Sequence, residues 1–270
     1  MSKLTIDDLV KKEGEEEIVI DIKDQNEYKK TYDVYKREIE EKHPFAPGVL
    51  EKIIRGYSGL GNYKEACELQ KVVYNVRKEI LGKNHLQTLS ALNNLASYYS
   101  YLGDYNTALK MRNTVYNARK DILGRNHSNT LSALENLAVS YSCLGDYNSA
   151  FELQNTVYNA RKEIQGANHP DTLSALYCLA CSYFDLGDYD KALEIQNTVC
   201  NERKKNLGEN HLDTLTSLAN LANIYSYLKD YNKVLEMRNA VYNARKDILG
   251  ENHPDTLSAL ENLAVCYPYF

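Results

Sequence analysis

Residues 92–127 read LNNLASYYSYLGDYNTALKMRNTVYNARKDILGRNH, and related stretches return along the chain every 42 residues, the separation of His85 from His127. At this offset a glycine and an Asp-Tyr or Asn-Tyr pair align in successive copies, as do all six histidines of the chain. The histidines are His43, His85, His127, His169, His211 and His253. A fixed period of this size predicts a solenoid, whose units bury their apolar faces only by stacking on one another.

Each copy of the repeat predicts a pair of helices. Leu92, Leu95 and Ala96 follow the i, i+3, i+4 spacing of an inner helix. Gly103 suits the left-handed backbone that follows a helix, and Asp104 suits the N-cap of the next one. The outer helix is then predicted to turn inward Ala108, Met111, Val115 and Ile122. The unit is therefore a helix, a tight turn and a second helix.

These signals predict an all-α fold, an α-solenoid of helix-turn-helix repeats. Inner helices are predicted over 46–59, 88–101, 130–143, 172–185, 214–227 and 256–267. Outer helices are predicted over 63–81, 105–123, 147–165, 189–207 and 231–249. The array spans 46–267 as five helix pairs plus a final unpaired inner helix. A degenerate capping helix is expected within 24–45, a partly disordered non-repeat segment over 1–23, and a C-terminal tail over 268–270.

The composition is that of a folded, soluble chain. Hydrophobic residues make up 43% and charged residues 26%, and no apolar run is long enough to span a bilayer. The formal charge of −5 argues against nucleic acid as a partner, because a protein that neutralises phosphates carries a basic face. Six scattered cysteines fit reduced thiols. We therefore expect a cytoplasmic protein that binds neither nucleic acid nor membrane.

The residues of the repeat carry a resemblance to a known family. The segment Leu92-Asn93-Asn94-Leu95-Ala96, then Leu102-Gly103-Asp104-Tyr105 and Gly124-Arg125-Asn126-His127, resembles the 42-residue tetratricopeptide repeat of kinesin light chains and their relatives. This resemblance implies a right-handed superhelix whose inner helices line a concave groove. It also implies that the groove binds a peptide or a helix of a partner protein, without enzymatic activity and without a cofactor.

Helical arithmetic places a set of side chains on the groove face of the inner helices. The predicted groove residues are Lys52, Arg55, Asn93, Asn94, Ser97, Glu135, Asn136, Tyr177, Cys178, Cys181, Asn220, Asn223, Glu261 and Asn262. Four of them, Asn94, Asn136, Asn220 and Asn262, share one register and are called here the asparagine ladder, which Cys178 interrupts. An amide both donates and accepts, as an extended peptide backbone requires. The alternative is that these amides bond to adjacent helices or to water.

Positions that differ between copies are expected to set the specificity of the groove. They are Asn93, Glu135, Tyr177, Ala219 and Glu261, with Tyr101, Phe184 and Tyr227 near helix ends. Lys52 and Arg55 would suit an acidic end of the ligand, whereas Glu135 and Glu261 would favour cationic groups. The alternative is a solvated face that binds no ligand.

The aligned histidines and the pair Cys178 and Cys181 also suggest a site, but their placement argues against one. The histidines lie one repeat apart, too far apart to share a metal ion, so packing or local hydrogen bonding is the preferred interpretation. The two cysteines lie in mid-helix without a second pair, which favours a packing role. An enzyme that uses these groups and a regulatory or sensor repeat domain of a larger signalling protein remain alternatives. The uncapped final helix is predicted to mark either a truncation or a surface for self-association.

Overall fold

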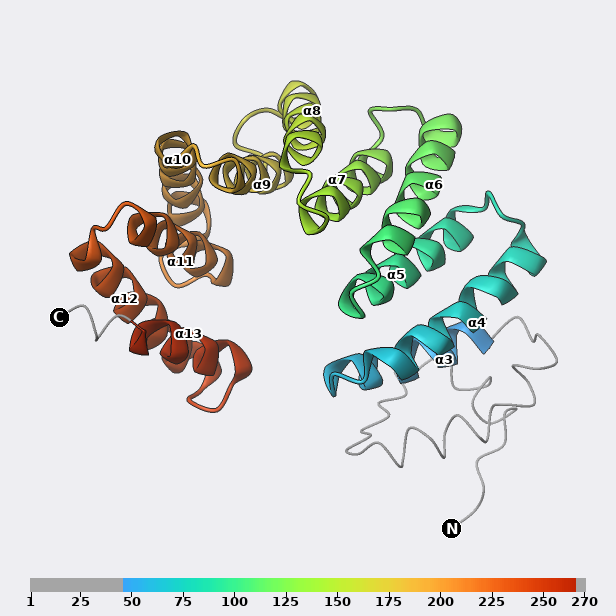
Figure 1. Ribbon diagram of the computed structural model, residues 1–270, viewed down its shortest axis with the longest axis horizontal. Helices are drawn as coiled ribbons and strands as arrows, with labels where there is room; N and C mark the ends of the chain where they lie inside the picture. The colour runs from blue at the N-terminus through green and yellow to red at the C-terminus, as the bar shows by residue number, and fades with distance from the viewer. Residues whose placement is uncertain (1–45, 266–270) are drawn as a thin grey trace, which may run out of the picture. The chain divides into compact units, whose positions relative to one another are not determined.

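The computed structural model describes residues 46–265, which form eleven α-helices and no strand (Figure 1). The inner helices are α3 (Ala46–Gly59), α5 (Leu86–Tyr101), α7 (Ser128–Cys143), α9 (Pro170–Asp185), α11 (Leu212–Tyr227) and α13 (Pro254–Ala264). The outer helices are α4 (Tyr63–Leu81), α6 (Tyr105–Leu123), α8 (Tyr147–Gln165), α10 (Tyr189–Leu207) and α12 (Tyr231–Leu249). The predicted all-α class is confirmed. The predictions for 1–23, 24–45 and 268–270 lie outside the described residues.

The outer helices have the predicted bounds, but α5, α7, α9, α11 and α13 begin two residues before the predicted starts. The cause is the histidine of each copy, which is the N-cap of the inner helix. In α9, for example, Nδ1 of His169 accepts a hydrogen bond from the main-chain N–H of Asp171, with the two nitrogens 3.1 Å apart. His85, His127, His211 and His253 make the same bond. Local hydrogen bonding, the preferred interpretation of the aligned histidines, is therefore confirmed for these five.

The turn between paired helices also follows the sequence signals. Gly187 has a φ of 82°, and Oδ1 of Asp188 accepts from the main-chain N–H of Lys191 at the start of α10. The same position of the fifth copy holds Lys229, which is the one non-glycine residue with positive φ among residues 46–265. A lysine side chain there takes the left-handed backbone at a conformational cost that glycine avoids.

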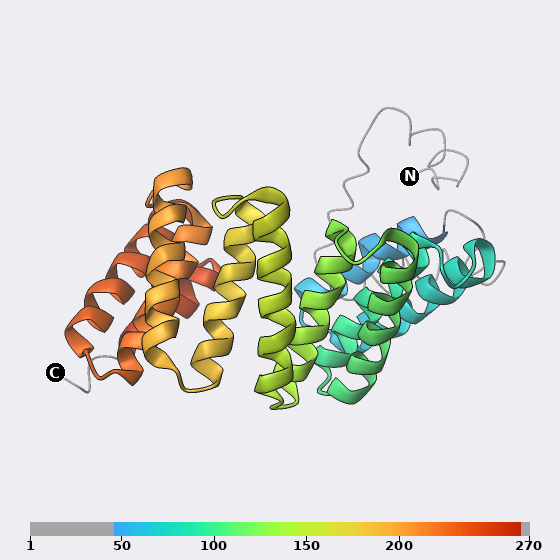
Figure 2. The ribbon, with the colours of Figure 1, turned by 90° about the horizontal axis from the view of Figure 1, so that it is seen from above.

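The chain divides into two compact units, Met1–Gly103 and Asp104–Phe270. In the described part of the first unit, α3 and α4 enclose a core of Leu50, Ile53, Ile54, Tyr57, Ala66, Leu69 and Val73, joined by Ala91 of α5. In the second unit, Leu131, Leu134 and Leu137 of α7 pack with Val157 of α8 and Ala175 of α9. Successive helices of the second unit pack side by side, which Figure 2 shows from above.

The predicted inward face of the outer helix is correct for Ala108 and Val115, both fully buried. It is wrong for Ile122, which is 47% exposed. Ile122 lies in the last turn of α6, which ends at Leu123.

The final inner helix leaves part of its apolar face uncovered. Leu257 and Leu260 of α13 are 45% and 42% exposed, whereas the equivalent Leu131 and Leu134 of α7 are each 4% exposed. In α7 that face packs against α8. Self-association through α13 stays a prediction, and light scattering at high concentration would test it.

Candidate functional site

The predicted groove residues lie on the inner helices of both units. Lys52 and Arg55 are exposed on α3, and Asn93, Asn94 and Ser97 lie on α5, so these five belong to the first unit. The other nine belong to the second unit, on α7, α9, α11 and α13. In the second unit, the structure brings several members of the set together around pockets.

A pocket of about 160 Å³ lies between α9 and α11 and is called here the α9–α11 pocket. Its lining consists of Ala180, Cys181, Phe184, Asp185, Gln196, Asn220, Asn223 and Ile224. Three predicted groove residues, Cys181, Asn220 and Asn223, therefore share one concavity. Gln196 is 1% exposed and donates from Nε2 to the main-chain oxygen of Ser217 at 3.1 Å, which holds α10 against α11 below the pocket.

A smaller pocket of about 40 Å³ lies on the other side of Asn223. It is lined by Ala219, Asn223, Arg238, Val241, Arg245, Ala259 and Asn262. Arg238 of α12 spans it, since Nη1 donates to the main-chain oxygen of Asn262 at 2.7 Å and Nη2 donates to Oδ1 of Asn223 at 3.3 Å. Asn223 thus contributes to two adjoining pockets between consecutive inner helices. Glu261, also on α13, is exposed.

Tyr177 connects the predicted groove residues of α9 and α11. Its hydroxyl accepts a hydrogen bond from Nδ2 of Asn220 and also hydrogen-bonds to Cys181. The guanidinium of Arg203 lies over its ring, with Cζ 5.2 Å from the ring centre. Burial, together with the nearby thiols, raises the pKa of Tyr177 to about 12. At this member of the asparagine ladder, the amide is bonded to the adjacent inner helix, as the alternative interpretation expected.

Sequence reasoning missed the partner of Glu135. Arg161 of α8 donates from Nη2 to Oε2 of Glu135 at 2.8 Å. Burial raises the pKa of the Glu135 carboxyl above its usual value, although Arg161 opposes this shift. The carboxylate expected to attract a cationic ligand group is therefore already held by a cation of the next helix.

The same ion pair occurs in the first unit, where Nη1 of Arg77 lies 2.8 Å from Oε1 of Glu51. Both pairs join residues that lie 26 positions apart in the sequence. The recurring arginine of each outer helix thus lies at a fixed distance in sequence after the variable position of the inner helix before it. This fixed spacing was the signal in the sequence that could have predicted the ion pairs.

The mid-helix cysteines lie in a setting that disfavours the thiolate. Burial raises the pKa of Cys178 to about 12 and that of Cys181 to about 11. Since the thiolate is the nucleophile and the metal ligand, both groups are poorly suited to either role near neutral pH. Residues 46–265 contain no group of three or more His, Cys, Asp or Glu side chains that could hold a metal ion.

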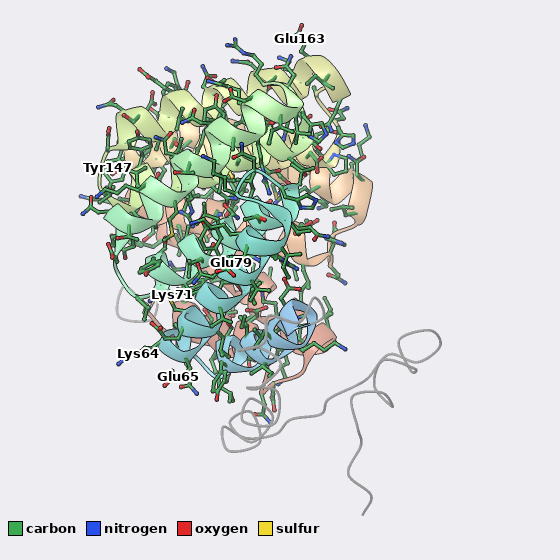
Figure 3. All side chains as sticks on the ribbon, turned by 90° about the vertical axis from the view of Figure 1, so that its right-hand side faces the viewer. Lys64, Glu65, Lys71, Glu79, Tyr147 and Glu163 are labelled. Carbon is green, nitrogen blue, oxygen red and sulfur yellow. The ribbon has the colours of Figure 1, made fainter. Side chains whose placement is uncertain are left out.

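The outer helices of each unit also carry polar and charged side chains outside the predicted groove set. In Figure 3 the labelled Lys64, Glu65, Lys71 and Glu79 lie along α4, and Tyr147 and Glu163 lie towards the two ends of α8. A pocket of about 290 Å³ on the first unit is lined by Tyr57, Lys64, Glu65, Glu68 and Leu69. It contains none of the predicted groove residues. None of the helices in the described part of the chain is both long and apolar enough to cross a bilayer.

The family model described as tetratricopeptide repeat matches residues 49–121, 102–163, 129–201 and 171–247. The chain belongs to the tetratricopeptide repeat family. None of the curated proteins compared with this tetratricopeptide repeat protein matches it.

Solved structures share the fold. A putative kinesin light chain with nearly identical repeats from Podosopora anserina is 24% identical, with 77% of this chain and 98% of that one covered and a TM-score of 0.61. BtubC (BKLC) from P. vanneervenii is 16% identical, with 84% and 94% covered and a TM-score of 0.64. A Rap protein in complex with competence and sporulation factor is 14% identical, with 90% and 69% covered and a TM-score of 0.56. The predicted family and the α-solenoid fold are confirmed.

Proposed function

We propose that this tetratricopeptide repeat protein is a non-enzymatic scaffold that binds an extended peptide or a helix of a partner protein along its inner helices. The family supports the general role, because tetratricopeptide repeats are a protein-interaction fold. The observation that carries the specific proposal is the pair of adjoining pockets at Asn223, one between α9 and α11 and one between α11 and α13. The solved Rap protein, which has the same fold, is complexed with competence and sporulation factor.

The chemistry of the two pockets suits a peptide better than a small molecule. Sites for small molecules usually measure about 300–1,000 Å³, more than either pocket offers. Volumes of about 160 Å³ and 40 Å³ instead fit individual side chains that enter from a chain lying across them. Asn220, Asn223 and Asn262 line these two pockets, and their amides can bond to the main chain of such a ligand.

The magnitudes show that the amides alone are not sufficient. Three hydrogen bonds at a net of about 1 kcal/mol each fall short of the roughly 8 kcal/mol of a micromolar complex. Side-chain burial in the pockets must supply the difference. The proposal therefore places specificity in the α9–α11 pocket and not in the ladder.

A pull-down from native cytosol tests the proposal with a triple variant, Asn220→Ala, Asn223→Ala and Asn262→Ala. The matched control changes Asn159, Asn201 and Asn243, exposed asparagines that share one register on the outer helices, to alanine. We expect the inner-face variant to lose captured protein and the control to retain it. Thermal unfolding of both variants separates lost binding from lost folding. Equal capture by a folded inner-face variant would reject the proposal.

A further inference from the structure

Several polar groups of the α9–α11 pocket can accept hydrogen bonds from a ligand. Asp185 contributes a carboxylate, and Nδ2 of Asn220 is bonded to Tyr177, which leaves Oδ1 of Asn220 as the acceptor available to a ligand. Oδ1 of Asn223 already accepts from the guanidinium of Arg238 at 3.3 Å, and a carbonyl oxygen has a second lone pair. The pocket therefore suits a group that carries several donors.

The carboxylate of Asp185 has no cation to balance it among the residues that the structure describes. Desolvation by its surroundings raises the pKa of Asp185 above the usual value, and no charged neighbour contributes to the shift. Two other acids of the inner helices differ in this respect, since Glu135 is paired with Arg161 and Glu51 with Arg77. A ligand cation would supply the counter-charge that the protein supplies elsewhere.

An aromatic cluster adjoins the pocket. The ring of Phe184, which lines the pocket, meets Tyr227 edge-on with ring centres 4.7 Å apart and Tyr189 with centres 5.3 Å apart. Tyr227 is 59% exposed and stacks on Tyr189. A guanidinium stacks on aromatic rings and donates in its own plane at the same time. Arg203 over Tyr177 makes this type of contact within the same unit.

Phe184 and Asp185 place an aromatic side chain next to an acid, a combination that occurs in only one repeat. One repeat earlier, the equivalent residues are Ser142 and Cys143. One repeat later, they are Ser226 and Tyr227. The neighbouring repeats therefore have the same helices but lack the aromatic and acidic side chains of this pocket.

We propose that the α9–α11 pocket binds the guanidinium of an arginine side chain on the partner peptide, with Asp185 as its counter-ion, an inference that rests on the proposed function. The guanidinium donates to Asp185 and to Oδ1 of Asn220, and its plane lies against Phe184. The volume of about 160 Å³ equals roughly five waters, enough for one long side chain and too little for a second.

Capped amino acids test the pocket without knowledge of the partner. Nα-acetyl-arginine amide is titrated into the full chain labelled with ¹⁵N, and the side-chain amide signals of Asn220 and Asn223 are followed. The matched probe is Nα-acetyl-citrulline amide, which has the same shape but no charge. We expect citrulline to bind about three- to tenfold more weakly than arginine, as the loss of one partly exposed ion pair predicts. Capped leucine and capped glutamate should not shift these signals.

The protein variant is Asp185→Asn, and the matched control is Asp247→Asn, an exposed acid on α12 outside the pocket. We expect Asp185→Asn to reduce arginine binding by the same factor and to abolish the preference over citrulline, with Asp247→Asn unchanged. Equal binding of arginine, citrulline and leucine would overturn the inference, as would the absence of any shift at the highest soluble concentration.

The outcomes separate this inference from the proposed function. Partner capture that depends on the inner-face asparagines, without arginine binding, would refute the pocket and leave the scaffold standing. Arginine binding without partner capture would support the pocket and refute the scaffold. Free L-arginine that binds as tightly as the capped form would indicate a free amino acid as the ligand, and would overturn the assignment to a peptide.

Discussion

Arg161 of α8 and Glu135 of α7 form an ion pair with Nη2 and Oε2 2.8 Å apart. Nη1 of the same guanidinium donates to the main-chain oxygen of Asp171 on α9 at 2.9 Å. One side chain thus joins three successive helices across the boundary between two repeats. Because the side chains of Arg161 and Glu135 are only 9% and 23% exposed, water screens the pair weakly.

Arg161→Ala should destabilise the protein by about 2–4 kcal/mol, because it leaves a partly buried carboxylate without its counter-ion and removes a hydrogen bond to the main-chain oxygen of Asp171. Urea unfolding measures the loss. Arg77→Ala is the matched comparison, since its pair with Glu51 has side chains 17% and 36% exposed and should lose less. A smaller loss for Arg161→Ala than for Arg77→Ala would show that burial does not set the strength of these pairs.

Glu135→Gln should be at least as stable as the natural protein at neutral pH. Burial raises the pKa of Glu135 in the folded state above its ordinary value of 4.5, so the folded chain binds this proton more tightly than the unfolded chain. The contribution of Glu135 to stability is therefore largest at pH values below 4.5 and decreases as the pH rises through the folded-state pKa. Denaturation of both proteins across this range should show the variant gaining relative stability with rising pH. The opposite trend would mean that Arg161 outweighs burial.

Lys229→Gly should raise stability by about 0.5–1 kcal/mol, because Lys229 has a φ of 62° that glycine adopts without a steric penalty. The converse change, Gly187→Lys at the equivalent turn, should lower stability by a similar amount. A Cβ at Gly187 would meet no atom within 4 Å, so the backbone conformation is the only cost. Thermal unfolding of the two variants provides the measurement. Equal and unaltered melting temperatures would refute the argument.

Thr172→Val should be neutral or stabilising by up to about 1 kcal/mol, since the Thr172 hydroxyl is buried without a hydrogen-bond partner among the described residues. Thr88 occupies the same register in the first unit, but its hydroxyl donates to the main-chain oxygen of Arg77 at 3.2 Å. Thr88→Val should therefore cost about 1 kcal/mol. Chemical denaturation of the pair distinguishes the two cases, and a loss of equal size at both positions would contradict the difference in bonding.

The sequence by itself determined the period, the helix pairs and their ends, because these depend on local interactions. The 3.6-residue spacing of Leu131, Leu134 and Ala138, the left-handed turn at Gly187 and the cap at Asp188 each involve residues a few positions apart. The starts of the inner helices were the exception, because a histidine is an uncommon N-cap.

Only the tertiary structure decided which groove side chains are engaged within the protein and which surround a pocket. Glu135 meets Arg161 across 26 residues, and Tyr177 meets Asn220 across 43. Whether such residues touch depends on how helices from successive repeats pack and on the rotamers that this packing allows, which no local pattern specifies. Asp185 and Asn220 likewise belong to different repeats, and only the packing of α9 and α11 on α10 places both in the lining of one pocket.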